Sequence, residues 1–342
     1  MNSQIKASLF RLMPQLIALA AILLLNFTMF PHFFHLEVQN GRLYGSVIDV
    51  LNRGAPVALL AIGMTLVIAT KGIDLSVGAV IAICGAVAAS TIVAGNSLAY
   101  TLMLTIGIGI ACGLWNGFLV AALGIQPIIA TLVLMVAGRG IAQLITEGVI
   151  LTFNNDGLIF FGSGSFAWLP MPVVVWLVLG FAVILLVRRT ALGMLVEAIG
   201  INRRASTLSG IQTPVLLMAV YAFSGLCASI AGIVVSADIK GADANNAGLW
   251  LELDAILAVV VGGNSLLGGR FSIVGSLIGA MIIQSVNTGI LLSGFPPEFN
   301  LVIKAVIVIV ILVIQSPALK SLTAILWSRR DGAQMIQKEQ VK

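Results

Sequence analysis

The chain has 342 residues, of which 59% are hydrophobic and only 9% are charged. A soluble globule of this length needs more polar surface, so the composition excludes a soluble enzyme and indicates an integral membrane protein. The formal net charge of +5 requires no nucleic-acid partner, because positive residues gathered on the cytoplasmic side of a membrane protein account for it.

Apolar runs of about 20 residues, the length of a membrane-spanning helix, follow one another along nearly the whole sequence. They predict about ten spans, at residues 12–30, 47–70, 76–94, 98–122, 127–146, 170–187, 213–236, 249–262, 272–292 and 300–318. We therefore expect an all-α, polytopic transmembrane helical bundle with interrupted helices. Its parts are a cytoplasmic N-terminus at 1–11, a transmembrane domain at 12–318 and a cytoplasmic C-terminal tail at 319–342.

The orientation follows from the basic residues. An even number of spans places both termini on one side, and a cytoplasmic placement puts most of the 18 basic residues inside, as the positive-inside rule requires. The loops at 31–46, 147–169 and 237–248 then lie outside, where an external partner can bind.

A glycine-rich break separates the second and third apolar runs, with the sequence Thr70-Lys71-Gly72-Ile73-Asp74-Leu75-Ser76-Val77-Gly78. Unpaired backbone groups and a carboxylate are costly in hydrocarbon, so the break predicts interrupted helices around a polar pathway, as in a transporter. Asp74 can cap the next helix by accepting the amides of Ser76 or Val77. Capping alone and capping combined with lining of the pathway both remain open.

A second glycine-rich break at 261–269 also lies between two apolar runs. The likeness fits a parallel internal repeat of the kind many transporters contain. Chance similarity between glycine-rich loops explains it equally well. Glycines at four-residue spacing predict close helix contacts elsewhere in the bundle. They are Gly109, Gly113 and Gly117 in one span, and Gly275 and Gly279 in another.

Polar side chains recur at membrane depth, where contact with lipid is expensive. We expect them to point into the bundle, to pair with one another or to line a cavity for a hydroxyl-rich solute. The candidates for the substrate pathway are Asn52, Asp74, Trp115, Asn116, Gln143, Glu252, Asp254, Gln284 and Asn287. Arg53 and Arg139 are either further pathway residues or ion-pair partners of Glu252 or Asp254.

The segment 190–211 is the longest internal polar stretch between spans. Asn202 is a suitable N-cap and Gly210 a suitable C′ residue, which predicts about two helical turns outside the membrane with Ala205 and Leu208 exposed. Such a helix can dock a cytoplasmic partner. The alternative is an ordinary basic loop that fixes the topology.

Other chemistry finds little support. The cysteines lie in apolar runs without the spacing of a disulfide framework or zinc site, and His32 and His35 lack a third metal ligand. The sequence has no phosphate-binding loop or nucleophile motif, so an intramembrane enzyme is disfavoured and nucleotide energy must come from another chain. An ion-coupled secondary sugar transporter, with Glu252 and Asp254 as a close acidic pair, stays the alternative.

Several motifs resemble the sugar-type permeases of ATP-binding-cassette importers, a family that includes the ribose, xylose and arabinose systems. The motifs are Gly63 to Ala69, Gly72 to Ala79, Asn116-Gly117, Gln126-Pro127, Thr131-Leu132, Arg139-Gly140, Glu197 to Asn202 and Ser209 to Ile211. The resemblance covers nearly the whole chain. It implies that 190–211 is the coupling loop that contacts the ATPases, through Glu197, Gly200, Asn202, Ser209 and Gly210.

The resemblance also implies the surroundings of the chain. We expect a second permease subunit, cytoplasmic ATPase subunits and a periplasmic sugar-binding protein at the bacterial inner membrane. ATP and Mg²⁺ belong to the ATPases, and this chain binds no cofactor or metal. The segments 237–254 and 291–298 resemble those of galactofuranose importers, in which two different permeases form the pore. Lys71 departs from the glycine that relatives usually carry at this position.

Overall fold

The computed structural model describes residues 2–39, 41–294, 296, 299, 301–306 and 309, with side chains from residue 12 onward. The chain divides into two units, residues 1–289 and residues 290–342. The predicted span at 300–318 lies mostly outside the described residues, and the predicted tail at 319–342 lies wholly outside them. The description below concerns the first unit.

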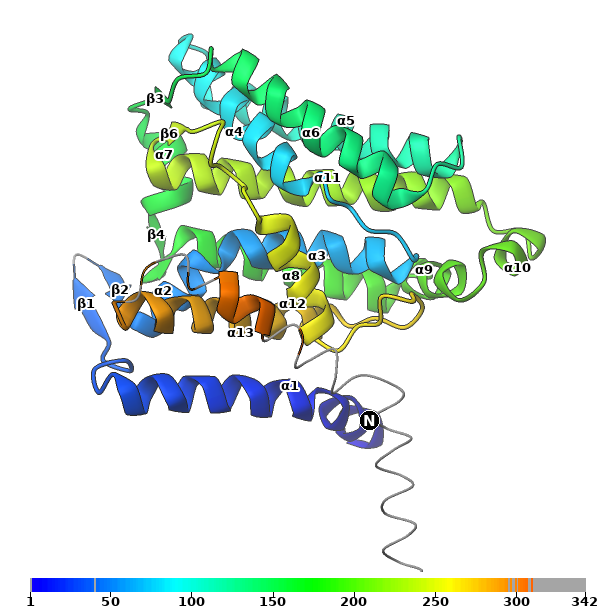
Figure 1. The fold of residues 1–342 in the computed structure, drawn as a ribbon, viewed down its shortest axis with the longest axis horizontal. Helices are drawn as coiled ribbons and strands as arrows, with labels where there is room; N and C mark the ends of the chain where they lie inside the picture. Colours follow the sequence, from blue (N-terminus) through cyan, green and yellow to red (C-terminus); the bar gives the residue numbers. More distant parts are fainter. Residues whose placement is uncertain are drawn as a thin grey trace, which may run out of the picture. The chain divides into compact units, whose positions relative to one another are not determined.

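Helices dominate the described residues (Figure 1). They are α1 (Asn2–Met29), α2 (Ser46–Arg53), α3 (Ala55–Ala69), α4 (Val77–Val93), α5 (Leu98–Ala121), α6 (Pro127–Ile145), α7 (Asp156–Ser163), α8 (Met171–Arg189), α9 (Leu192–Ile201), α10 (Arg203–Leu208), α11 (Thr213–Ile239), α12 (Leu251–Val261) and α13 (Ile273–Leu292). Short antiparallel strand pairs join β1 (Glu37–Gln39) to β2 (Arg42–Tyr44), β3 (Leu151–Thr152) to β6 (Gly241–Ala242), and β4 (Ser165–Phe166) to β5 (Leu169–Pro170).

Six described helices are long and apolar enough to cross a membrane, namely α1 from Leu12 onward, α5, α6, α8, α11 and α13. The helices α2 and α3, bent by 43° where they meet, add a seventh if they form one span. The helical, membrane-spanning class is therefore confirmed. The count of about ten spans stays a prediction, because α4 and α12 are shorter than a full span. The cytoplasmic placement of the termini also stays a prediction.

Local sequence explains where the long helices begin. A proline stands in the first turn of α3, α6, α8 and α11, where its missing N–H costs no intrahelical hydrogen bond. Ser97 caps α5 by accepting the amide of Tyr100 at 3.3 Å. The boundaries predicted from the apolar runs lie close to the observed ones in these helices.

The centre of the first unit is α11, which packs against α3, α4 and α5 (Figure 1). A Cβ at Gly113 would overlap the carbonyl oxygen of Tyr221 in α11, and one at Gly117 would lie 2.8 Å from Cα of Met218. Backbone approach this close needs glycine, so the predicted packing role of the α5 stripe is confirmed. The second stripe, in α13, packs in the same way on the backbone of Ala258 and Gly262.

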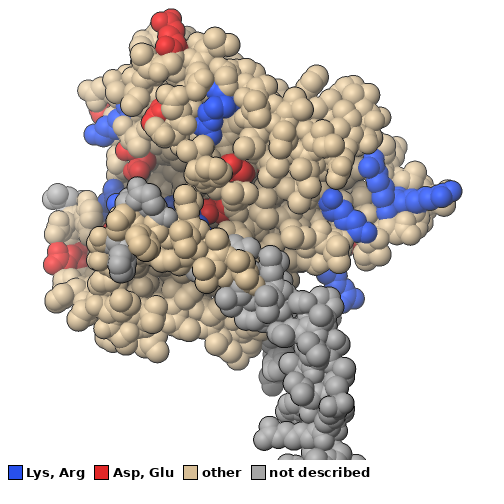
Figure 2. Space-filling model, in the orientation of Figure 1, with Lys and Arg blue, Asp and Glu red and all other residues tan. Residues whose placement is uncertain are grey.

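The two ends of the first unit differ in charge. The loops predicted to lie outside, with β1, β2, β3, β6 and α7, gather at one end, and α9, α10 and the beginning of α1 lie at the other (Figure 1). On the face shown in Figure 2, most acidic side chains lie toward the first end and a group of basic side chains covers the α9–α10 end. Basic side chains also lie at the first end on this face (Figure 2), so the orientation stays a prediction.

Candidate functional site

The first break is held by a buried carboxylate. Asp74 is only 1% exposed. Its Oδ1 accepts the amide of Ser76 at 3.1 Å and the hydroxyl of Ser76 at 2.6 Å, and its Oδ2 accepts the hydroxyl of Ser224 in α11 at 2.8 Å. Asn116 of α5 donates to the Ser76 hydroxyl at 2.8 Å. The predicted hydrogen bond to the Ser76 amide is present, but α4 begins at Val77 and has no side-chain cap, so Asp74 holds the turn before the helix. Its bonds extend into a network that ties the break to α5 and α11.

Helix α6 ties the same break from another direction. The amide of Leu75 donates to the Thr131 hydroxyl at 3.1 Å, and that hydroxyl lies 3.2 Å from the carbonyl oxygen of Ile73. The Tyr221 hydroxyl and Oδ1 of Asn116 are buried without a hydrogen-bond partner among the described atoms. The break is thus fixed by three helices and keeps unused hydrogen-bonding capacity beside its carboxylate.

The second break contains an equivalent polar anchor, Asn264, which is 4% exposed. Its side-chain amide donates to the carbonyl oxygen of Val259 at 3.0 Å and to the Ser276 hydroxyl at 2.9 Å, and its Oδ1 accepts the amide of Ser272 at 2.6 Å. Thr65 of α3 donates to the same Ser276 hydroxyl at 2.6 Å. Each break therefore has one buried Asp or Asn that bonds the start of the following helix, a feature the predicted repeat would share.

A second polar group lies around the start of α12. Glu252 and Asp254 are 4% and 5% exposed, and Oε2 of Glu252 has no hydrogen-bond partner within the described structure. Arg139 donates to the carbonyl oxygens of Ala244, at 3.1 Å, and Ala247. Among the described residues no salt bridge joins Arg53 or Arg139 to Glu252. Pairing of either arginine with Asp254 stays a prediction.

The remaining candidates divide between the interior and the surface. Gln284 and Asn287 of α13 lie 3.5 Å apart, side-chain oxygen to nitrogen, and Asn52 of α2 has a buried Oδ1 without a partner among the described atoms. Gln143 of α6 donates to Asn245 at 2.7 Å. Trp115 lies at the surface of the unit, 53% exposed. Direct contacts thus divide the predicted pathway residues among separate polar groups.

The segment 190–211 forms two helices where one was expected. Asn202 caps α10 by accepting the amide of Ala205 at 3.0 Å, Gly210 has φ +86°, and Leu208 is 82% exposed. The predicted short helix is therefore confirmed. The helix before it, α9, was missed, although its buried residues Gly193, Val196, Ile199 and Gly200 have helical spacing.

The end of α9 touches both breaks at once. The carbonyl oxygen of Ala69, at the end of α3, accepts the amide of Gly269 at 2.9 Å. A Cβ at Gly200 would overlap that oxygen and lie 2.6 Å from the Gly269 nitrogen. Lys71 donates to the carbonyl oxygen of Ile201 at 3.1 Å. We call this contact of Ala69, Lys71, Gly200, Ile201 and Gly269 the three-way junction.

Lys71 adopts a left-handed backbone conformation, with φ +64°. Glycine reaches this region without steric cost, so lysine is strained here where glycine would not be. The lysine side chain compensates by capping the C-terminal end of α9 through its bond to Ile201.

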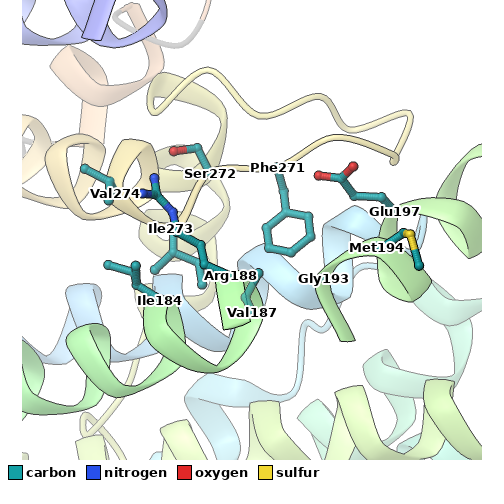
Figure 3. A pocket seen from close by; sticks show the side chains of 10 residues that line it. All are labelled: Ile184, Val187, Arg188, Gly193, Met194, Glu197, Phe271, Ser272, Ile273 and Val274. Carbon is teal, nitrogen blue, oxygen red and sulfur yellow. The ribbon is translucent and has the colours of Figure 1, made fainter. Parts of the chain in front are cut away.

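A cavity of about 330 Å³ lies between the last turn of α8, the helix α9 and the start of α13 (Figure 3). Its walls are Ile184, Val187, Arg188, Gly193, Met194, Glu197, Phe271, Ser272, Ile273 and Val274. Glu197, predicted to contact the ATPase, therefore lies in α9 and lines this cavity. Within the described residues no group of three His, Cys, Asp or Glu side chains could hold a metal ion.

Comparison with known proteins now fixes the family. Residues 46–312 match the family of branched-chain amino acid transport systems, permease component. The chain belongs to this family. The galactofuranose transporter permease protein of Escherichia coli (strain K12) is 62% identical to this permease over 310 residues, which cover 91% of each chain. The fructose import permease protein of Bifidobacterium longum (strain NCC 2705) is 42% identical, over 89% of this permease and 87% of its own chain.

A third relative, the ribose import permease protein of Escherichia coli (strain K12), is 37% identical over 88% of this permease and 92% of its own chain. No solved structure matches the permease. The resemblance that the sequence motifs suggested is therefore confirmed. The permease is a membrane-embedded transport component and not an enzyme.

Several residues that shape the permease interior were missed by sequence reasoning. Ser224 and Asn264 each hold a break, yet a serine or asparagine within or beside an apolar run gives little signal by itself. Thr131 was named only as part of a family motif, without its role in holding the first break. Tyr221 offers a clearer one, because a tyrosine hydroxyl inside an apolar span needs a polar partner or water. The structure places this hydroxyl beside Gly72 of the first break.

Proposed function

We propose that the permease carries a monosaccharide, galactofuranose in the first instance, across the bacterial inner membrane as a subunit of an ATP-binding-cassette importer. The observation that carries the proposal is the 62% identity to a galactofuranose transporter permease over 91% of both chains. Two further relatives are a fructose and a ribose import permease. Sugars are rich in hydroxyl groups, and buried amides and carboxylates with unused hydrogen-bonding capacity suit such a solute.

The translocation pathway in this proposal is formed by the polar groups around the interrupted helices. Asn52, Gln284 and Asn287 form one part, and Gln143, Glu252 and Asp254 form another. Asp74 and Asn116 together hold the first break through Ser76. Trp115 faces outward from the unit. Opening and closing of the pathway follow from movement of the segments that join α3 to α4 and α12 to α13.

The energy comes from partner subunits. The family is one of permease components, which work with other chains, and we propose ATPase subunits with bound ATP and Mg²⁺, a second and different permease, and a periplasmic sugar-binding protein. Asn202, Ser209 and Gly210 form the α10 tip that contacts the ATPase. Glu197 and Gly200 act behind the tip, where Gly200 adjoins both breaks.

Ion coupling is the competing proposal, and the acidic pair at the start of α12 is the feature that would serve it. Family membership favours the ATP-driven importer, because the relatives are import permeases. The deciding experiment reconstitutes the permease with and without its ATPase and binding protein in liposomes and follows the uptake of labelled galactofuranose, fructose and ribose. We expect concentrative uptake of galactofuranose only with the full complex and ATP. Concentrative uptake by the permease alone under an ion gradient would overturn the proposal.

A further inference from the structure

The cavity between α8, α9 and α13 contains two side chains of opposite charge that form no ion pair with each other among the described residues. Arg188 enters it from the last turn of α8 and Glu197 from α9 (Figure 3). Within the described structure neither side chain forms an ion pair with the other or with a third residue. A cavity that presents one free cation and one free anion is complementary to a ligand that carries both charges, and a purely anionic ligand would meet repulsion from Glu197.

The other side chains that line the cavity are mostly apolar, while polar atoms supply the larger part of its exposed lining. Val187, Phe271, Ile273 and Val274 are among them. At about 30 Å³ for each water-sized group, the volume of about 330 Å³ accommodates roughly ten such groups, which is enough for a small headgroup and the first atoms of the chains attached to it. The ligand should therefore be amphipathic, with a zwitterionic part and an apolar part.

The position of the cavity indicates where such a ligand comes from. The helix α8 is long and apolar enough to span a membrane, and it ends at Arg189, next to the cavity. In the same turn Leu185 and Leu186 are each 47% exposed, so the surface that faces acyl chains continues directly to the cavity. This is the level at which lipid headgroups lie, and basic pockets between spans at this level bind them.

We propose that this cavity binds the phosphoethanolamine headgroup of a membrane lipid, with its phosphate at Arg188 and its ammonium group at Glu197. A primary ammonium donates hydrogen bonds to a carboxylate, whereas the quaternary ammonium of a choline headgroup cannot. The lipid joins α8 to α9 and to the segment before α13, and so reaches the three-way junction from the membrane side. The proposal does not depend on which sugar the permease carries or on its energy source.

The test uses the full-length permease purified in mild detergent, without ATPase or binding protein. The protein is incubated with equimolar phosphatidylethanolamine, phosphatidylcholine and phosphatidylglycerol, and the retained lipids are counted by native mass spectrometry. We expect a preference for phosphatidylethanolamine. Arg188→Gln and Glu197→Gln should each reduce this preference about threefold to fivefold, the effect of one exposed ion pair. Arg188→Lys should restore most of it, and Arg189→Gln, at an exposed arginine outside the cavity, should leave it unchanged.

Four outcomes would overturn the proposal. The first is equal retention of the three lipids by the wild-type permease. The second is a loss of the preference for phosphatidylethanolamine in Arg189→Gln as large as that in Arg188→Gln. The third is a preference for phosphatidylglycerol that Glu197→Gln increases, because the occupant would then be an anionic lipid. The fourth is retention of soluble phosphoethanolamine, added in place of the lipids, as strong as that of phosphatidylethanolamine. The apolar side chains of the cavity would then contribute nothing to binding. Since no transport is measured, a failure here differs from a failure of the proposed import function.

Discussion

The three-way junction allows a specific test of how α9 is joined to the breaks. Gly200 has no side chain, and a Cβ built there would overlap the Ala69 carbonyl oxygen and lie 2.6 Å from the Gly269 nitrogen. Both neighbours are backbone atoms, so Gly200→Ala must displace the end of α9 or break the 2.9 Å hydrogen bond between Gly269 and Ala69. Overpacking of this kind costs about 1–3 kcal/mol, and loss of the hydrogen bond adds about 1 kcal/mol.

An alanine in a helix otherwise gains up to about 1 kcal/mol over glycine, so the expected net destabilisation is about 1–3 kcal/mol. The assay is thermal unfolding of the purified permease, together with ATPase stimulation by the binding protein in the reconstituted complex. We expect a lower unfolding midpoint and weaker stimulation. The matched control is Gly140→Ala in α6, where a Cβ meets nothing within 4 Å and stability should be unchanged or higher. If Gly200→Ala matched the wild type in both measurements, the junction would not be a tight contact and the reasoning would be wrong.

Three further changes probe other parts of the permease. Ser224→Ala removes the hydroxyl that donates at 2.8 Å to the buried carboxylate of the first break, and should destabilise the protein by about 1–3 kcal/mol in thermal unfolding. Leu208→Asp, at the 82% exposed tip of α10, should leave unfolding unchanged and reduce co-purification of the ATPase. A hydrogen bond from the Asn246 side chain holds the pKa of Asp243 below its usual value. Its stabilising effect on the 243–246 turn is present above the ordinary pKa and is lost as the pH falls through the lowered one, and carboxyl titration by NMR should show Asn246→Ala raising that pKa.

Each of these changes has a control or a contrary outcome. Ser163→Ala removes an exposed hydroxyl that bonds only within its own helix. It should destabilise the protein much less than Ser224→Ala does. Val149→Asp introduces the same charge at a 62% exposed position in a loop predicted to lie outside, and it should not affect the ATPase. If Val149→Asp weakened co-purification as much as Leu208→Asp, the α10 tip would not be the contact. An unchanged titration of Asp243 in Asn246→Ala would contradict the assigned hydrogen bond.

The sequence predicted those features that local patterns determine. The apolar runs and the glycine-rich break predicted the end of α3 and the start of α4, because helix ends depend on residues within one turn of them. The cap of α10 by Asn202 was predictable for the same reason. The packing glycines of α5 were also recognisable, although the sequence did not show that their partner is α11.

Contacts between distant residues were not predictable in this way. The hydroxyl of Ser224 meets Asp74 across 150 positions, and Lys71 meets Ile201 across 130. Nothing in the neighbourhood of these residues specifies the partner, since span order does not determine which helix faces which. For the same reason the sequence marked polar residues that the structure buries, such as Asp74, Asn116 and Glu252, but it did not show their division into separate groups or the outward position of Trp115.

The bond between Asp74 and Ser224 also constrains how the protein is made. A ribosome that adds about 5–20 residues per second needs roughly 8–30 s to synthesise the 150 positions between them. Throughout that interval the nascent chain contains an acidic group whose mate has not yet emerged, next to a membrane that rejects it. We therefore expect the early helices to stay in a polar environment until α11 supplies the second partner of this carboxylate.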